Sequence, residues 1–263
     1  MTKQSKILAG FAIVAVLVLG SGMFRLLDNT YHLTGGHGEV VDALIARNIA
    51  ARGGAEAWRS VSSLKLSGLL DLGHGMYVPY VLLQKRPAKM CLEFVFDEET
   101  AIQCVDGDSG WKLLPFRGHK TPEAMNELEL REMADMADLD GLLFDSARRG
   151  HKVELVSREQ VNGRPADKLQ VTLPGGARRW VYLDVETALE LKLESTRLLR
   201  GKERTVETFY SNWQETDGIL IPRRQLTQTQ GDKEAHFLVV ELAVVNPPLQ
   251  DTRFAMAVAS GPI

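Results

Sequence analysis

Much of the chain alternates between apolar and polar residues with a period of two. Leu64 and Leu66 are separated by polar residues, and residues 189–193 place leucines between charged side chains in the same way. This period is typical of β-strands that bury one face and expose the other. Turn sequences such as Asn162-Gly163 interrupt the pattern at short intervals. The sequence therefore predicts a mainly β protein with about ten or eleven antiparallel strands and a few helices.

Two segments have helical periodicity instead. Residues 41–49 carry apolar side chains at helical spacing and are followed by Gly53-Gly54, which predicts a helix that stops there. Thr121-Pro122-Glu123 has the residues of a second helix start, namely an N-cap, a proline at the first helical position and an acid near the positive end. This second helix either packs permanently on the sheet or forms a lid over it, since methionines adapt to irregular apolar partners such as acyl chains. It ends near Gly141, and its apolar stripe consists of Met125, Leu128, Met133 and Met136.

The N-terminal segment has a third pattern. Residues 7–24 contain no charged side chain, follow Lys3 and Lys6, and precede Arg25. As a helix they would be about 27 Å long, close to the roughly 30 Å of a bilayer's hydrocarbon core, and the two lysines favour a cytoplasmic N-terminus. We therefore expect one N-terminal transmembrane helix that places the rest of the chain outside the cytoplasm.

The sequence leaves open whether this segment is retained. Residues 19–22 (LGSG) form a fair signal-peptidase site, so the segment is either an anchor or a cleaved signal. With retention, the expected divisions are a cytoplasmic n-region (1–6), a transmembrane anchor or uncleaved signal (7–27), a linker (28–37) and one domain (38–263). The expected location is the inner membrane, single-pass, with the main domain in the periplasm. Cleavage would instead leave a soluble periplasmic protein.

Charge excludes one class of partner. Residues 1–27 hold three basic residues and no acidic one, so the remainder carries 28 Lys and Arg against 34 Asp and Glu, a formal charge of −6. A negative balance argues against nucleic acid as a partner. The remaining length suits one large all-β domain or two small ones, and 44% hydrophobic residues in the whole chain are enough for a sizeable core.

The two cysteines are candidates for a disulfide. Cys91 and Cys104 flank Asp97-Glu98, and a two-residue hairpin turn at that dipeptide would set the cysteines directly opposite each other. A disulfide is then expected in an oxidising compartment. The same register sets Leu92 beside the polar Gln103. Neither cysteine lies in a CxxC pair or at a metal-ligand spacing, so neither is predicted to be catalytic.

Several short motifs, taken in order, resemble the LolA-like periplasmic proteins, the outer-membrane lipoprotein-sorting family. The resemblance covers about residues 38–256 and implies an incomplete antiparallel β-barrel (a half-barrel) covered by helices, with an apolar concave face for lipid acyl chains. The motifs are Arg86-Pro87 before a strand, residues 103–116 (QCVDGDSGWKLLPF), the helix start at Thr121, residues 161–166 (VNGRPA), residues 217–222 (DGILIP), and residues 245–254 with Val-Asn-Pro and Asp-Thr-Arg-Phe.

Face alternation supplies apolar residues for such a cavity. Leu92, Phe94 and Phe96 share one face of their strand, and Val81 and Leu83 are expected to line the same interior. The residues alone do not distinguish a cavity from a solid core, because every barrel or sandwich fills its interior with such side chains; the resemblance favours the cavity. The predicted acyl-chain site consists of Leu66, Val81, Leu83, Leu92, Phe94, Phe96, Trp111, Met125, Leu128, Leu191 and Leu193.

Arg86 is the candidate for a lid latch. The resemblance implies an arginine near the mouth of the half-barrel that ties the lid closed, and Arg86 is the nearest match in this sequence. The alternative is that Arg86 is simply a cation at a strand edge.

No pattern of catalytic residues is present in the sequence. The six histidines show no HExxH or HxH spacing, and no GxSxG motif occurs. Asp135, Asp138 and Asp140 lack the spacing of a calcium loop and are interpreted as an acidic helix end. The sequence predicts no catalytic residue, no metal site and no cofactor.

These observations predict a non-enzymatic envelope protein that binds lipids or lipidated proteins. Its expected partners are acyl chains and the inner membrane, with a membrane transporter or another envelope protein as a further candidate, but not nucleic acid. One alternative is a membrane-anchored sensor or scaffold that docks a protein partner. An envelope hydrolase is the other alternative, and converging carboxylates or a His beside a Ser would support it.

Overall fold

The computed structural model describes residues 38–199, 202–232 and 234–256, which divide into two compact units. The first unit contains residues 60–139 and 236–256, and the second contains residues 38–59 and the described part of 140–235. The thirteen strands among the described residues belong to an open antiparallel sheet. The prediction of a mainly β protein with few helices is confirmed, whereas the expected ten or eleven strands were too few.

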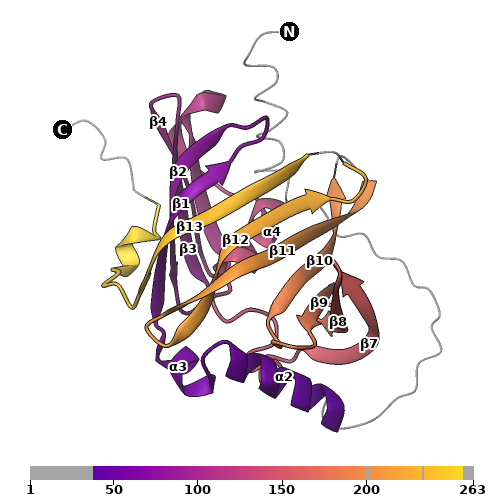
Figure 1. The fold of residues 1–263 in the computed structure, drawn as a ribbon. Helices are drawn as coiled ribbons and strands as arrows, with labels where there is room; N and C mark the ends of the chain where they lie inside the picture. Colours follow the sequence, from indigo (N-terminus) through magenta and orange to yellow (C-terminus); the bar gives the residue numbers. More distant parts are fainter. Residues whose placement is uncertain (1–37, 200–201, 233, 257–263) are drawn as a thin grey trace. The chain divides into compact units, whose positions relative to one another are not determined.

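The first unit contains seven strands in the order β6-β5-β4-β3-β2-β1-β13, together with the helix α4. Figure 1 labels α4 and the strands β1, β2, β3, β4 and β13. Strands β1 to β6 are consecutive in the chain, and β13 returns from the C-terminal part to pair with β1. The bounds are β1 Ser63–Asp71, β2 Tyr77–Lys85, β3 Lys89–Phe96, β4 Glu99–Asp106, β5 Ser109–Leu114, η1 Pro115–Arg117, β6 His119–Ala124, α4 Glu127–Ala137, β13 Ala235–Val245 and η2 Asp251–Arg253.

The second unit contains six strands in the order β12-β11-β10-β9-β8-β7 and is preceded by the predicted helix near residues 41–49. That helix, α2, packs Val41 and Ile45 against a core from β7, β8 and β9. Gly53 ends it in a left-handed conformation, and a Cβ there would collide with the carbonyl oxygen of Gly218. The bounds are α2 Glu39–Ala51, α3 Ala55–Ser60, β7 Lys152–Val161, β8 Arg164–Thr172, β9 Arg178–Asp184, β10 Glu190–Leu199, β11 Lys202–Thr216 and β12 Ile219–Thr229.

The helix predicted to start at Thr121 begins later. Residues 119–124 form β6, which pairs with β5 alone, and such an edge strand tolerates Pro122 because one side of its backbone needs no partner. The helix start is instead a capping box: Asn126 Oδ1 accepts a hydrogen bond from the backbone N–H of Glu129 at 3.0 Å, and Glu129 Oε2 accepts one from the N–H of Asn126 at 3.0 Å. The prediction of a helix in this region is therefore correct, but its start at Thr121 is wrong.

The predicted transmembrane segment, residues 7–27, lies outside the described residues, as do the n-region and the linker. Among the helices of the described ranges, none combines the length and the apolar character needed to cross a membrane.

Candidate functional site

The strand register of the first unit determines which predicted site residues share a face. Leu66 pairs with Leu82, and Leu82 pairs with Leu92, so these three side chains lie in one row across β1, β2 and β3. Phe94 lies in the next row, opposite Tyr80. Leu66, Leu92 and Phe94 are all buried. Since α4 is anchored to side chains of this face, as described below, we call it the helix face.

Phe96 also belongs to the helix face, two positions beyond Phe94 on β3. The ring of Phe116 lies next to both phenylalanines, with centroid distances of 6.1 Å to Phe94 and 5.5 Å to Phe96. Gln103 lies beside Leu92, as the sequence predicted. The helix face is therefore apolar with isolated polar side chains.

Val81, Leu83 and Trp111 lie on the opposite face, contrary to prediction. Leu83 pairs with Cys91, and Cys104 pairs with Trp111, so all of these side chains alternate away from Leu92 and Phe94. Each strand alternates as expected. The prediction for Val81 and Leu83 was wrong because the β2–β3 register pairs Leu83 with Cys91, and the prediction for Trp111 was wrong because the β4–β5 register pairs it with Cys104.

Helix α4 is held at both ends by polar contacts with the sheet. Lys112 of β5 forms an ion pair with Glu129 in the first turn of the helix. At the other end, Gln84 Nε2 of β2 donates a hydrogen bond to the carbonyl oxygen of Met136 at 2.6 Å. Both Lys112 and Gln84 belong to the helix face by register. The sequence reasoning missed them because a polar residue in an alternating strand is normally interpreted as solvent-facing.

The middle of α4 approaches the sheet closely at Gly110 of β5. A Cβ at Gly110 would lie 2.8 Å from Leu130 Cδ2 and 3.0 Å from Met125 Sδ, so only glycine leaves room for the helix. Met125 is buried there, and its N–H donates to the Gly110 carbonyl oxygen at 2.9 Å. The backbone of Leu128 lies in α4, but its side chain is outside what the structure describes.

Arg86 directly follows Lys85, the last residue of β2. Its guanidinium donates to the carbonyl oxygen of Val61, and its backbone N–H donates to the carbonyl oxygen of Ser62 at 3.0 Å. Both contacts tie the end of β2 to the residues that precede β1. Gln84 and Lys112 contact α4, as described above, and the role of Arg86 as a lid latch stays a prediction.

Leu191 and Leu193 belong to the second unit. A β-bulge between Glu190 and Lys192 interrupts the alternation of β10, so that the two leucines join different clusters. Leu193 packs against the core beneath α2, whereas Leu191 packs with the cluster that includes Tyr182. These two predicted site residues thus belong to a different unit from Phe94.

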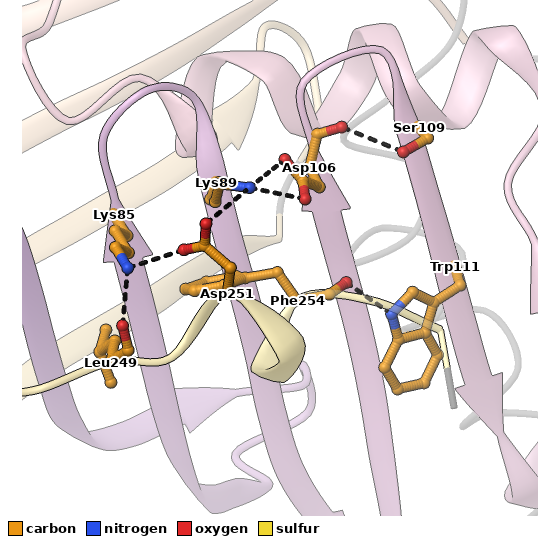
Figure 2. A network of polar contacts seen from close by, with 8 residues as sticks. All are labelled: Lys85, Lys89, Asp106, Ser109, Trp111, Leu249, Asp251 and Phe254. Atoms are coloured by element: carbon orange, nitrogen blue, oxygen red, sulfur yellow. Dashed lines mark hydrogen bonds and ion pairs between the residues drawn. The ribbon is translucent and has the colours of Figure 1, made fainter. Parts of the chain in front are cut away.

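The disulfide is confirmed on the face opposite α4. Cys91 and Cys104 are bonded across β3 and β4, with a Cα–Cα distance of 4.1 Å. Residues 247–256, which we call the C-terminal strap, cover this bond. Phe254 of the strap packs against both cysteines and Trp111, whose Nε1 donates to the Phe254 carbonyl oxygen at 2.9 Å (Figure 2).

Charged contacts fix the strap to β2 and β3. Lys85 Nζ donates to the Leu249 carbonyl oxygen and to Asp251 Oδ1, both at 2.7 Å (Figure 2). Lys89 Nζ lies 2.6 Å from Asp106 Oδ1 and 3.9 Å from Asp251 Oδ2. The hydrogen bond from Lys85 lowers the pKa of Asp251. The strap therefore covers the part of this face around the disulfide with one buried aromatic ring and a set of ion pairs.

The second unit carries a partly buried charge network around Lys192. Its ammonium lies 3.0 Å from Glu207 Oε1, contacts Glu194, and lies 4.1 Å from the ring centroid of Tyr182. Burial opposes the charged form of Lys192, but Glu194 and Glu207 outweigh it and raise its pKa. Burial, followed by the nearby Glu194, also raises the pKa of Tyr182. Glu194 and Glu207 thus converge on one ammonium and form an ion-pair network with it.

Within the described ranges, the structure contains no group of three or more His, Cys, Asp or Glu side chains arranged to hold a metal ion.

No protein-family model matches this sequence, and none of the curated proteins does. Solved structures do share its fold. A LolA superfamily protein from Nitrosomonas europaea is 12% identical with a TM-score of 0.55, covering 81% of this chain and 96% of that one. A putative outer membrane lipoprotein-sorting protein domain from Vibrio parahaemolyticus is 12% identical with a TM-score of 0.53, covering 82% and 94%.

A DUF1329 family protein from Desulfovibrio piger is 13% identical with a TM-score of 0.57, covering 82% of this chain and 97% of that one. The resemblance to the LolA-like proteins is therefore confirmed at the level of the fold. Identities this low establish nothing about the ligand.

Proposed function

We propose that this protein is a non-enzymatic envelope protein that binds the acyl chains of lipids or lipidated proteins against the helix face of its first unit. The observation that carries the proposal is that a buried apolar face, with Leu66, Leu92 and Phe94, is covered by one short helix. Polar contacts fix that helix at each end, through Lys112 and Gln84. The names of two solved relatives, a LolA superfamily protein and a lipoprotein-sorting domain, support the same function.

An acyl chain can replace α4 at this face without exposing it to water. When the two polar contacts break, the apolar side chains of α4 can pack on the ligand instead of the sheet, so their burial is retained. Each methylene that the ligand buries contributes about 0.8 kcal/mol. A chain of moderate length would therefore offset the loss of one partly buried ion pair and one hydrogen bond, which together are worth about 1–3 kcal/mol.

The proposed location is the periplasm. Residues 7–24 would anchor the protein in the inner membrane if they are retained, and the domain would be soluble if they are cleaved. An anchored protein would accept or present its lipid beside the membrane, whereas a cleaved one could diffuse across the periplasm.

A charge placed on the helix face tests the proposal. Phe94 is 2% exposed, and its neighbour Val95 on the opposite face is 43% exposed, so Phe94→Glu and Val95→Glu form a matched pair on one strand. In a lipid-accommodating groove, Phe94→Glu should keep the far-UV circular dichroism of the wild type but abolish binding of a fluorescent fatty acid. Val95→Glu should retain both the fold and the binding.

Two results contradict the proposal. Unfolding by Phe94→Glu would indicate a solid core, because an unpaired buried carboxylate costs several kcal/mol against a total stability of about 5–15 kcal/mol. A folded Phe94→Glu variant that binds the probe with unchanged affinity would show that the helix face is not the site.

A second candidate function is a scaffold that docks a protein partner. The observation that favours it is a set of exposed apolar side chains opposite the helix face, where Val95, Leu242 and Tyr77 are 43%, 55% and 52% exposed. If this surface docks a partner, Val95→Glu should abolish capture of that partner while leaving fatty-acid binding intact. Capture that is unchanged in the variant argues against this surface.

A further inference from the structure

The helix face ends in a buried histidine. Leu70 of β1 pairs with Leu238 of β13, and Leu70 shares a face with Leu66 by alternation. His236 lies two positions before Leu238 on the same strand, so its side chain belongs to the helix face as well. It is only 4% exposed. A polar ring therefore occupies the end of this apolar face, next to the β1–β2 turn.

The contact of Nδ1 with a backbone carbonyl determines which ring nitrogen of His236 carries the proton. Nδ1 of His236 lies 3.4 Å from the backbone carbonyl oxygen of Asp71. A carbonyl oxygen only accepts hydrogen bonds, so Nδ1 carries the proton in the neutral ring. Nε2 is then left with a lone pair and acts as an acceptor.

That acceptor has no hydrogen-bond partner among the described residues, and its atom is buried. Buried polar atoms in native proteins are paired in the great majority of cases, because an unpaired one loses its hydration without compensation. An acceptor without a partner, at the end of an apolar face, suits a ligand that brings a donor.

We propose that Nε2 of His236 accepts a hydrogen bond from the polar end of the bound ligand. This inference rests on the proposed binding of acyl chains to the helix face, and it specifies the ligand class: an acyl or alkyl chain whose polar end carries an O–H or N–H donor. The apolar chain follows the rows of Leu92 and Phe94, and the donor lies at the end where β1 turns into β2. From Leu66 to Leu70 the strand spans about 14 Å at about 3.4 Å per residue, which gives the chain an apolar path before it reaches His236.

Two probes that differ in one donor test this inference. Dodecan-1-ol carries an O–H, whereas its methyl ether keeps the oxygen and the chain but lacks the donor. Both would compete for the full-length protein against a fluorescent fatty acid. The wild type should bind the alcohol about tenfold more tightly than the ether, the effect of one hydrogen bond to a buried acceptor.

Two variants assign that preference to the histidine. His236→Phe keeps a ring of similar shape but has no acceptor, and should bind both probes with equal affinity. His236→Gln restores an acceptor oxygen and should recover part of the preference. The matched control is His151→Phe, which alters a buried histidine of the second unit whose Nδ1 faces the Leu142 carbonyl oxygen at 2.9 Å and should leave the preference unchanged.

The outcomes separate this inference from the proposed function. Equal affinity of the wild type for both probes overturns the role of His236 and leaves acyl-chain binding intact, a comparison that does not depend on any variant folding. A preference that survives in folded His236→Phe also overturns it. Failure of the fluorescent fatty acid itself to bind overturns the proposed function and this inference with it, whereas a bound fatty acid that neither probe displaces overturns this inference alone.

Discussion

Replacing Phe254 with alanine tests whether the C-terminal strap contributes to the stability of the first unit. Phe254 is 1% exposed and packs against the disulfide, Leu83 and Trp111. Truncating a fully buried phenylalanine costs about 3–5 kcal/mol, from lost burial and from the cavity that remains. This loss is a large fraction of the 5–15 kcal/mol, roughly, that stabilises a typical domain. The Trp111 hydrogen bond itself uses the Phe254 backbone and need not be lost.

Two measurements would follow the effect. Urea denaturation monitored by circular dichroism gives the change in the free energy of unfolding, and the ¹⁵N–¹H resonance of the Trp111 indole reports the strap locally. For a unit of about 100 residues, a loss of 3 kcal/mol lowers the melting temperature by roughly 12–24 °C. Met256→Ala is the matched control, since Met256 lies two residues away and is 45% exposed; its effect should stay within about 0.5 kcal/mol.

A loss below about 1 kcal/mol in Phe254→Ala would refute this reasoning, because no buried phenylalanine with intact packing is removed at so small a cost. The strap would then be a peripheral segment, and the stability of this face would come from the strands and the disulfide alone.

Two further predictions concern the same face. The free energy of unfolding should fall by about 3 kcal/mol in the double variant Cys91→Ala/Cys104→Ala, which is the chain-entropy value for a loop of this length. Thiol labelling of the unfolded, unreduced wild type should find no free cysteine. Two free thiols per chain would rule the bridge out. Because the pKa of Asp251 is lowered, its stabilising contribution is present above the ordinary pKa of about 3.9 and disappears as the pH falls through the lower folded value. In the wild type, hydrogen-exchange protection of residues 249–254 should therefore fall steeply below about pH 4. The Asp251→Asn variant should already be less protected than the wild type at pH 7. Equal protection of the two proteins at both pH values would contradict a stabilising role of the Asp251 carboxylate.

Local signals in the sequence were sufficient to predict the register of the β3–β4 hairpin and the disulfide that crosses it. Asp97 and Glu98 both have positive φ, 51° and 64°, as a two-residue hairpin turn with matching twist requires. A turn of fixed length fixes the register, and the register sets Cys91 opposite Cys104. The preceding hairpin, β2–β3, has a three-residue connection of less defined geometry. Its register, and with it the face on which Leu83 lies, could not be derived in the same way.

The first residue of α4 could not be predicted from local sequence. Thr121-Pro122-Glu123 and the capping box formed by Asn126 and Glu129 are both valid helix-start signatures, and local sequence does not choose between them. The choice depends on β5, because pairing with it makes residues 119–124 an edge strand. Tertiary pairing thus overrides a local signal, and it also adds a strand that the alternation pattern had not shown.

Contacts between distant residues are the part that sequence reasoning could not supply. The ties from Gln84 and Lys112 to α4, and the packing of Phe254 on the disulfide, join segments whose proximity follows only from the completed sheet. His236 gave no signal either, since a single histidine in an alternating strand is uninformative until the register assigns it to the face that carries Leu70 and Leu238.

The two coverings of this sheet differ in what their removal would cost. Lifting the strap would expose Phe254 and the disulfide to water, and no ligand that enters elsewhere could compensate for that loss. Lifting α4 would expose Met125, Met133 and the helix face, but an acyl chain entering between them buries both surfaces again. The cost of opening is then reduced to the contacts of Gln84 and Lys112, which water can replace at a small net cost. Opening is therefore favoured on the side of α4, so ligand binding should release protection of the α4 amides from hydrogen exchange while leaving that of the strap unchanged.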